Sequence, residues 1–268
     1  MSNMSHLNSA VCCVPLERVR YFPRQLLTAD DLTAEQDYYR EKMRRHNRYL
    51  HGWGVVCGCE VERMSGGDGL QVQVAPGFAI SPAGDEIHIC EPVNVNLQLG
   101  AQDQPCTVKA PCPPLGEMPP APADSRTLYI AVRYAECYSR PVRVHPAGCG
   151  CDEIACEYSR VRETFEMKIL WQLPDSHRRA AQEDARWCNR LRAASDALRK
   201  QASFPAPACP ECSDDPWVVL ASLAMPDGRN QKQTGSTEAG AVPQISYDDR
   251  RVLLSVQRLQ TALLCVGT

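Results

Sequence analysis

The period of the hydrophobic pattern changes near residue 52, and this change constrains the fold more than any other sequence feature. Between residues 28 and 51, apolar residues recur at spacings of three and four, which is typical of one face of an amphipathic helix. Residues 55–62 instead alternate as the two faces of a β-strand do. Gly52 suits the left-handed residue that ends a helix. We therefore expect a helix that passes directly into a sheet.

Both ends of this helix carry signals in the sequence. Thr28 is the expected N-cap, and Asp31 follows at the spacing of a capping box. Several arginines lie near the C-terminal end, where the helix dipole favours positive charge. We expect a histidine on the apolar face to be a core residue rather than a ligand. The expected apolar face consists of Leu32, Gln36, Tyr39, Met43, His46 and Leu50.

Short alternating runs fill most of the chain between residues 55 and 99, and turn sequences such as SGGDG separate them. This pattern predicts an antiparallel meander. Longer strands are expected at 127–136 and 160–171. Residues 217–225 are apolar on both faces, which predicts a central strand, and a short strand follows at 244–246.

Two further helices are expected after the first strands. One spans about residues 177–201, and the other spans 248–264 with Asp248 as its cap. The predicted class is α+β: a mainly antiparallel, meander-like or sandwich-like β domain with an N-terminal amphipathic helix, a mid-chain helix and a C-terminal helix. The apolar face expected for the mid-chain helix consists of Ala181, Ala185, Cys188, Leu191, Ser195 and Leu198.

The chain is predicted to divide near residue 54. Residues 1–54 are expected to pack on the β core, and residues 55–268 to form a β-rich domain. Two cysteine-rich loops are expected in this second part, at 137–156 and 203–215.

Composition narrows the functional class. Hydrophobic residues make up 44% of the chain and charged residues 23%, as in ordinary soluble globular proteins. The formal net charge of −3 gives no reason to expect nucleic acid or an anionic membrane as a partner. No stretch approaches the roughly eighteen apolar residues of a membrane span. The first residues lack the pattern of a signal peptide, so we expect synthesis in the cytoplasm.

The sharpest chemical pattern lies in the two cysteine-rich loops. Closely spaced cysteines made in a reducing cytoplasm favour metal binding, and Cys-x-x-Cys places two thiolates for one tetrahedral metal. We therefore predict one structural Zn²⁺, with disulfides or free thiols as the alternatives. Cys137 is a spare ligand, whereas Cys57, Cys59 and Cys90 are expected to be small buried hydrophobic residues. The candidate ligands are Cys149, Cys151, Cys156, Cys209 and Cys212.

The standard catalytic motifs do not occur in the sequence. It contains no G-x-S-x-G, H-E-x-x-H, Walker loop or H-x-E. Paired acids such as Asp248–Asp249 fall where helix capping explains them. The sequence therefore predicts no catalytic residues.

The stretch from Tyr21 to Val61 resembles a family of proteins encoded beside phage-tail-like contractile injection systems. Its pattern is F-x-x-x-L-L-T-x-x-D-[LF]-x-x-E-Q-x-Y followed by R-x-x-N-R-x-L-H-G-x-G-V-V-x-G. Cys59 stands where leucine is expected. The first half is matched by Phe22, Leu26, Leu27, Thr28, Asp31, Leu32, Glu35, Gln36 and Tyr38, and the second by Arg44, Asn47, Arg48, Leu50, His51, Gly52, Gly54, Val55, Val56 and Gly58.

This resemblance implies a non-enzymatic structural component of an injection particle, at the baseplate periphery or at a fibre attachment. It further implies other tail or baseplate subunits as partners, an oligomeric state within the particle, and a particle that acts outside the cell. Two alternatives stay open on the residues alone: a zinc-dependent enzyme or redox protein that uses the loop cysteines, and a carbohydrate-binding or receptor-binding module.

Overall fold

The computed structural model describes residues 15–64, 71–97, 127–143, 156–193, 209, 213, 215–224, 244–256 and 259. Within these residues the fold is mainly antiparallel β with two α-helices, which agrees with the predicted α+β class. The helical segments are α1 (Ala29–His46), the π-helical turn η2 (Asn47–His51) and α2 (Asp175–Ala193). The strands are β1 (Gly54–Gly58), β2 (Val61–Arg63), β3 (Gln71–Val74), β4 (Gly77–Ile80), β5 (Glu86–Ile89), β6 (Val93–Asn96), β7 (Thr127–Arg143), β8 (Cys156–Leu170), β9 (Val218–Ala224) and β10 (Gln244–Ser246).

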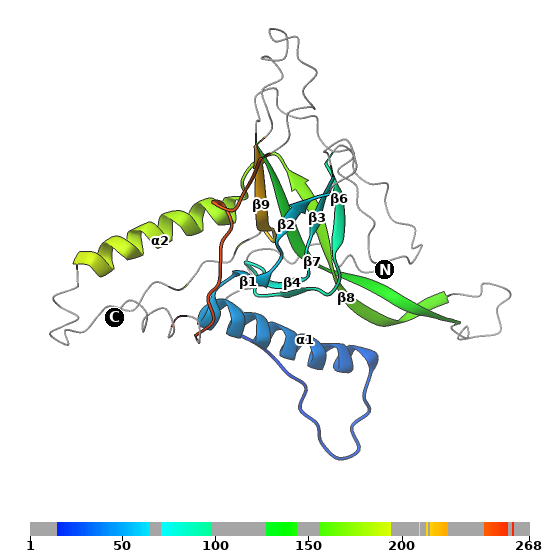
Figure 1. The fold of residues 1–268 in the computed structure, drawn as a ribbon. Helices are drawn as coiled ribbons and strands as arrows, with labels where there is room; N and C mark the ends of the chain where they lie inside the picture. The colour runs from blue at the N-terminus through cyan, green and yellow to red at the C-terminus, as the bar shows by residue number, and fades with distance from the viewer. Residues whose placement is uncertain are drawn as a thin grey trace, which may run out of the picture.

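These strands form three antiparallel sheets, in the orders β1-β4-β5, β2-β3-β6 and β10-β9-β7-β8 (Figure 1). The predicted antiparallel meander is confirmed for β2 with β3 and for β4 with β5. It is wrong for the other two pairs, because β1 pairs with β4 and β3 with β6. The physical reason lies at the corners. Gly58 (φ 61°) and Cys59 (φ 58°) both have left-handed backbones, which turn the chain out of one sheet and into another.

The core lies where the sheets meet. Its largest fully buried side chains come from every sheet, including Val72, Ile87, Ile130 and Leu220. Strand β9 pairs with β7 on one side and β10 on the other, and its residues from 218 to 223 are all buried. The prediction of a central strand there is confirmed.

Strands β7 and β8 continue well past the sheet. Only the first part of β7, from Thr127 to Val132, pairs with β9, whereas its pairing with β8 runs on to Arg143. The two strands thus leave the body as a twisted ribbon (Figure 1). The predicted loop at 137–156 is too long, because residues 137–143 and Cys156 belong to this ribbon. The antiparallel pairing with β8 keeps residues 137–143 extended as far as Arg143.

Helix α2 buries a different face from the predicted one. Ser176, His177 and Ala180 are buried, whereas Ala181 and Ala185 are exposed and belong to a helix that extends away from the body (Figure 1). The body contacts the start of this helix, so the burial follows position along the helix rather than its apolar periodicity.

The predicted start of the C-terminal helix at Asp248 is wrong. Residues 248–249 form a turn, and the chain then runs alongside β1. Val55 N–H donates to Arg251 O at 2.8 Å, and Leu253 N–H donates to Val55 O at 2.8 Å. These backbone hydrogen bonds replace the helical ones. Val256 and Leu259 are helical, and the rest of the predicted 248–264 span lies outside the described residues. In the part of the chain that the structure describes, no helix is long and apolar enough to cross a bilayer.

Candidate functional site

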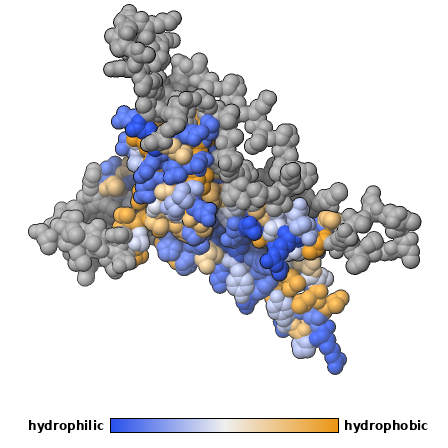
Figure 2. All heavy atoms as spheres, turned by 45° about the vertical axis from the view of Figure 1, so that its right-hand side comes forward, coloured by the Kyte–Doolittle hydropathy of each residue, from blue (hydrophilic) through white to orange (hydrophobic). Residues whose placement is uncertain are grey.

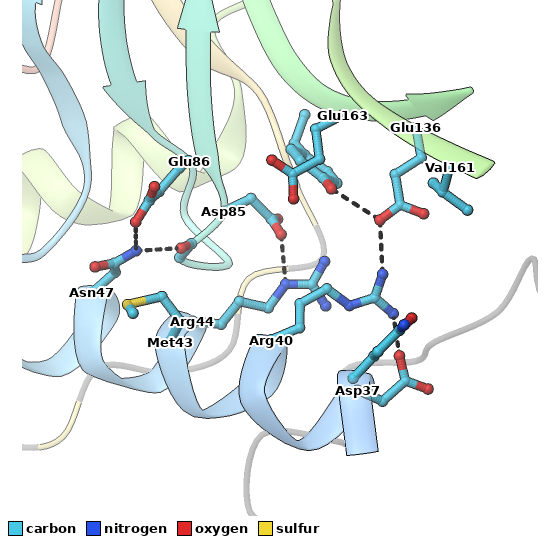
Figure 3. Close-up of a pocket in the computed structure, with 13 residues that line it drawn as sticks. Asp37, Arg40, Met43, Arg44, Asn47, Asp85, Glu86, Glu136, Val161 and Glu163 are labelled. Atoms are coloured by element: carbon cyan, nitrogen blue, oxygen red, sulfur yellow. Dashed lines mark hydrogen bonds and ion pairs between the residues drawn. The ribbon is translucent and has the colours of Figure 1, made fainter. Parts of the chain in front are cut away.

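Helix α1 contacts the body of the protein through its charged face. The Arg44 guanidinium donates from Nε to Asp85 Oδ1 and from Nη1 to Glu41 Oε1, both at 2.5 Å (Figure 3). One turn later, Asn47 Nδ2 donates to Gly84 O at 3.0 Å and to Glu86 Oε1 at 3.3 Å. The β4–β5 turn therefore holds the C-terminal half of α1 through charge and hydrogen bonding.

A second ion-pair group holds the middle of the helix against the β7–β8 ribbon. Arg40 lies 2.7 Å from Asp37 and 2.7 Å from Glu136 Oε1, and Tyr134 donates from its hydroxyl to the same Glu136 oxygen at 2.9 Å (Figure 3). Burial, followed by the hydrogen bond with Glu136 and nearby carboxylates, raises the pKa of Tyr134 well above its usual range. Tyr134 therefore stays a neutral hydroxyl donor.

These contacts surround a groove of about 420 Å³ between α1, the β4–β5 turn and the ribbon. Carboxylates outnumber guanidiniums along it, but the two arginines are each bound by two carboxylates. Its lining holds no cysteine or histidine. The groove is therefore a polar joint between helix and body.

Gly84 makes the close approach of helix and turn possible. Its φ is +96°, and a Cβ at this position would lie 2.2 Å from the Arg44 carbonyl oxygen. No other residue fits a left-handed backbone in direct contact with a second backbone.

The apolar face of α1 is exposed rather than buried. The prediction that this face packs on the core is wrong, since all six of its predicted residues, His46 included, are exposed and α1 contains no buried residue. The exposed fractions are large: 52% for Leu32, 57% for Tyr39, 52% for Met43 and 69% for Leu50. The charged face makes the polar contacts with the body. Gln36 and Met43 of the apolar face border the groove, whereas Leu32, Tyr39 and Leu50 do not line it.

The segment before the helix adds to this surface. Residues 15–28, here called the arm, carry exposed Tyr21, Phe22, Leu26 and Leu27. Apolar side chains gather on the lower part of the molecule, where α1 and the arm lie (Figure 2). We define the stripe as the exposed apolar residues of the arm and α1 together with Leu50 of η2: Tyr21, Phe22, Leu26, Leu27, Leu32, Tyr39, Met43 and Leu50.

The remaining motif residues build the joint that follows the helix. Gly52 N–H donates to Asn47 O at 2.9 Å and ends the π-helical turn. The segment after β10 then closes over β1. Tyr247 Oη accepts from Val61 N–H at 2.9 Å and donates to Val61 O at 3.1 Å. Arg251 donates to Trp53 O at 3.1 Å, and its guanidinium lies over the Trp53 ring at 5.1 Å.

The structure does not bring the predicted metal ligands together within the described residues. Cys156 begins β8 and Cys209 lies in a connection, and both are exposed free thiols; Cys149, Cys151 and Cys212 lie outside the described residues. Cys137 is disulfide-bonded. Among the residues that the structure describes, no three His, Cys, Asp or Glu side chains are arranged to hold a metal. The zinc site therefore stays a prediction.

The strand cysteines differ from one another in burial. Cys59 is fully buried, as expected of a small hydrophobic residue, and burial raises the pKa of its thiol to about 11. Cys57 and Cys90 are exposed, which corrects the prediction for both. For Cys57 the cause is the bulge between Val55 and Cys57, which shifts the alternation of β1 by one residue. Cys90 directly follows buried Ile89 of β5, so regular alternation places it on the exposed side.

The acids that hold α1 were not identified from the sequence. Asp85, Glu86 and Glu136 are distant in sequence from the helix that they bind. The sequence did contain one indication of such partners: Arg40, Arg44 and Arg48 recur every four residues and form a charged helix face. That face required acidic partners elsewhere in the chain.

Replacing Asp85 with asparagine is expected to loosen α1 while leaving the sheets intact. Arg44 and Asp85 are mostly buried, with side chains 19% and 11% exposed, so removing the charge costs about 2 kcal/mol. Hydrogen exchange should show faster exchange of α1 amides and unchanged exchange in β9. Asp37→Asn is the matched control, because the Asp37–Arg40 pair is more exposed and contributes less than about 1 kcal/mol. Equal effects of the two substitutions would contradict this account of the joint.

Comparison with known proteins places the chain in no family. Its sequence matches no protein-family model and no curated protein. Among solved structures, the crystal structure of TssK is similar with a TM-score of 0.33 and 11% sequence identity. That similarity covers 87% of this chain and 41% of the TssK chain. The chain thus spans less than half the length of that protein, and a TM-score of this size does not establish a shared fold.

Proposed function

We propose that this protein is a non-enzymatic structural subunit of a phage-tail-like contractile injection particle, at the baseplate periphery or at a fibre attachment. The observation that carries the proposal is the inverted orientation of α1. Its charged face binds the body, and its apolar face is exposed along the whole helix. A soluble subunit that presents such a face is suited to assembly with another protein.

The size of the stripe supports this role. Single exposed apolar residues are common on soluble proteins, but a contiguous patch is typical of an interaction site. Burying a side chain the size of leucine or tyrosine stabilises by about 1.5–3 kcal/mol. The stripe contains eight such side chains, and burying several of them against a partner would offset the entropic cost of association.

Residues of the sequence pattern between Tyr21 and Val61 hold the helix that carries the stripe. Arg44 and Asn47 bind the β4–β5 turn, and Gly52 ends the helical segment. These residues fix the direction in which α1 presents its exposed face. In this proposal, the residues of the sequence pattern hold α1 on the body and orient its exposed apolar face toward a partner. The partners are other tail or baseplate subunits, within an oligomeric particle that is made in the cytoplasm and acts outside the cell.

The proposal is tested by the composition of purified particles. A strain that carries an epitope-tagged copy of this chain should yield contractile particles in which the tag copurifies with sheath and baseplate proteins at a fixed ratio. Deleting the gene should reduce the number of complete particles. Particles that form normally and lack the chain would overturn the proposal.

A further inference from the structure

A small pocket lies where η2, the start of α2 and Arg251 meet. Its volume is about 140 Å³, which is below the range of sites for drug-sized ligands. The described residues that line it include three arginines, Arg48, Arg179 and Arg251, but a single acid, Glu183. Arg251 is paired with Asp184 at 2.5 Å, so Arg48 and Arg179 against Glu183 leave a small excess of positive charge around the pocket. It is separate from the groove beneath α1.

Arg48 is an unusual feature of this pocket. Its exposed fraction is 7%, and its polar contact is a hydrogen bond from Nη1 to Ala83 O at 3.2 Å. Its Nε is buried and has no hydrogen-bond partner. No carboxylate among the described residues lies within ion-pair distance of it. A buried cation without a counter-charge is strongly destabilising unless an anion accompanies it.

The opposite side of the pocket carries a second unsatisfied group. Ser176 lies in the first turn of α2, is 5% exposed, and has a buried Oγ without a hydrogen-bond partner. The N-terminus of this 19-residue helix carries partial positive charge and backbone N–H groups that bind anions. Both unsatisfied side chains thus belong to the same pocket and favour the same kind of ligand.

We propose that this pocket binds a small tetrahedral oxyanion of the size of phosphate. Arg48 and Arg179 would supply charge-assisted hydrogen bonds, and the Ser176 hydroxyl would supply a third donor beside the α2 N-terminus. Arg48 is a buried residue of the π-helical turn η2, which directly follows α1. The bound anion would tie η2, the β4–β5 turn and α2 together at one point.

The proposal is tested by titrating the full-length protein with sodium phosphate in a calorimeter, with sodium chloride at equal ionic strength as the reference. We expect saturable binding of phosphate, and a rise in the melting temperature that sodium chloride does not produce. Arg179→Gln and Ser176→Ala should each weaken binding roughly tenfold, the effect of losing one hydrogen bond to a charged ligand. Arg178→Gln is the matched control, because Arg178 lies on the same helix outside this pocket and should leave affinity unchanged.

Two further measurements keep the outcome decisive. Arg179 is exposed, so its replacement should leave the melting temperature without phosphate unchanged and separate binding from folding. Sulfate should compete with phosphate, whereas formate at the same concentration should not. Phosphate heats equal to those of chloride, affinity unchanged in both pocket variants, or binding of formate alone would each overturn the proposal.

Discussion

Gly58→Ala is expected to lower the free energy of unfolding by on the order of 4 kcal/mol, from backbone strain combined with overpacking. Gly58 ends β1 with a φ of +61°, opposite Gly77 of β4. A Cβ at Gly58 would lie 2.1 Å from Pro76 O and 2.8 Å from Gly77 Cα. Because both contacts are with backbone, no side chain can rotate to relieve them. Urea unfolding followed by circular dichroism measures the loss.

Gly52→Ala is the matched control for this substitution. Gly52 also has a positive φ, +82°, but the nearest atom to its Cβ position is Leu253 Cδ1 at 3.7 Å, an ordinary contact. With ψ at −153°, Gly52 lies in a backbone region that is essentially restricted to glycine, so the control should cost the backbone strain alone, about 2 kcal/mol. The difference between the two variants isolates the close packing at the β1–β4 corner. Equal losses would contradict the close packing assigned to Gly58.

Acidification is expected to destabilise the protein through His177, by on the order of 3 kcal/mol between pH 6.5 and about 4. His177 is buried, its Nε2 accepts from Val219 N–H at 3.0 Å, and its ring meets Trp53 edge-on at 4.7 Å. Burial is the main cause that lowers its pKa from 6.5 to about 4, and Arg251 adds to the effect, against opposing hydrogen bonds with backbone. A protonated ring cannot accept the Val219 hydrogen bond.

The sign follows from the direction of the shift. The folded state holds His177 neutral where the unfolded chain already binds a proton, so stability is complete above pH 6.5 and falls as the pH drops toward 4. His177→Gln retains an acceptor for Val219 N–H but does not titrate. The variant should be less stable at pH 7 and should lack this part of the acid-dependent loss, as measured by unfolding midpoints across pH 4–7. The same pH slope in both proteins would contradict a buried neutral His177.

The positions of secondary structure could be predicted from local pattern, but the faces of the helices could not. Thr28 caps α1 through a capping box with Asp31, and β9 is the central strand that its apolar run predicts. The hydrophobic periodicity of the sequence predicts an apolar face on α1. Which face of α1 contacts the body depends on residues that are distant in sequence. Asp85 and Glu136 attract the arginines of the opposite face, and no local rule includes them.

Non-local contacts also explain the other corrections. Asp248 has the composition of a helix cap, but backbone hydrogen bonds between Val55 and residues 251 and 253 keep the chain extended beside β1. The bulge in β1 exposes Cys57, although its alternation predicts burial. Of the candidate site, the sequence indicated the motif and its helix-to-strand joint. The exposure of the stripe could not be predicted, because it depends on which face of α1 contacts the body across the groove.

The measurement that tests the central claim most directly is the incorporation of a stripe variant into particles. Leu26→Ser, Leu32→Ser and Tyr39→Ser, combined in one chain, remove three exposed side chains and should leave the unfolding midpoint unchanged, because none of them packs in the core or lines the groove beneath α1. Incorporation, measured by mass spectrometry as the ratio of this chain to sheath protein, should fall by more than tenfold. Tyr138→Ser with Val142→Ser, equally exposed on the ribbon, is the control and should assemble normally. A folded stripe variant that assembles as well as the unmodified chain would contradict assembly through α1.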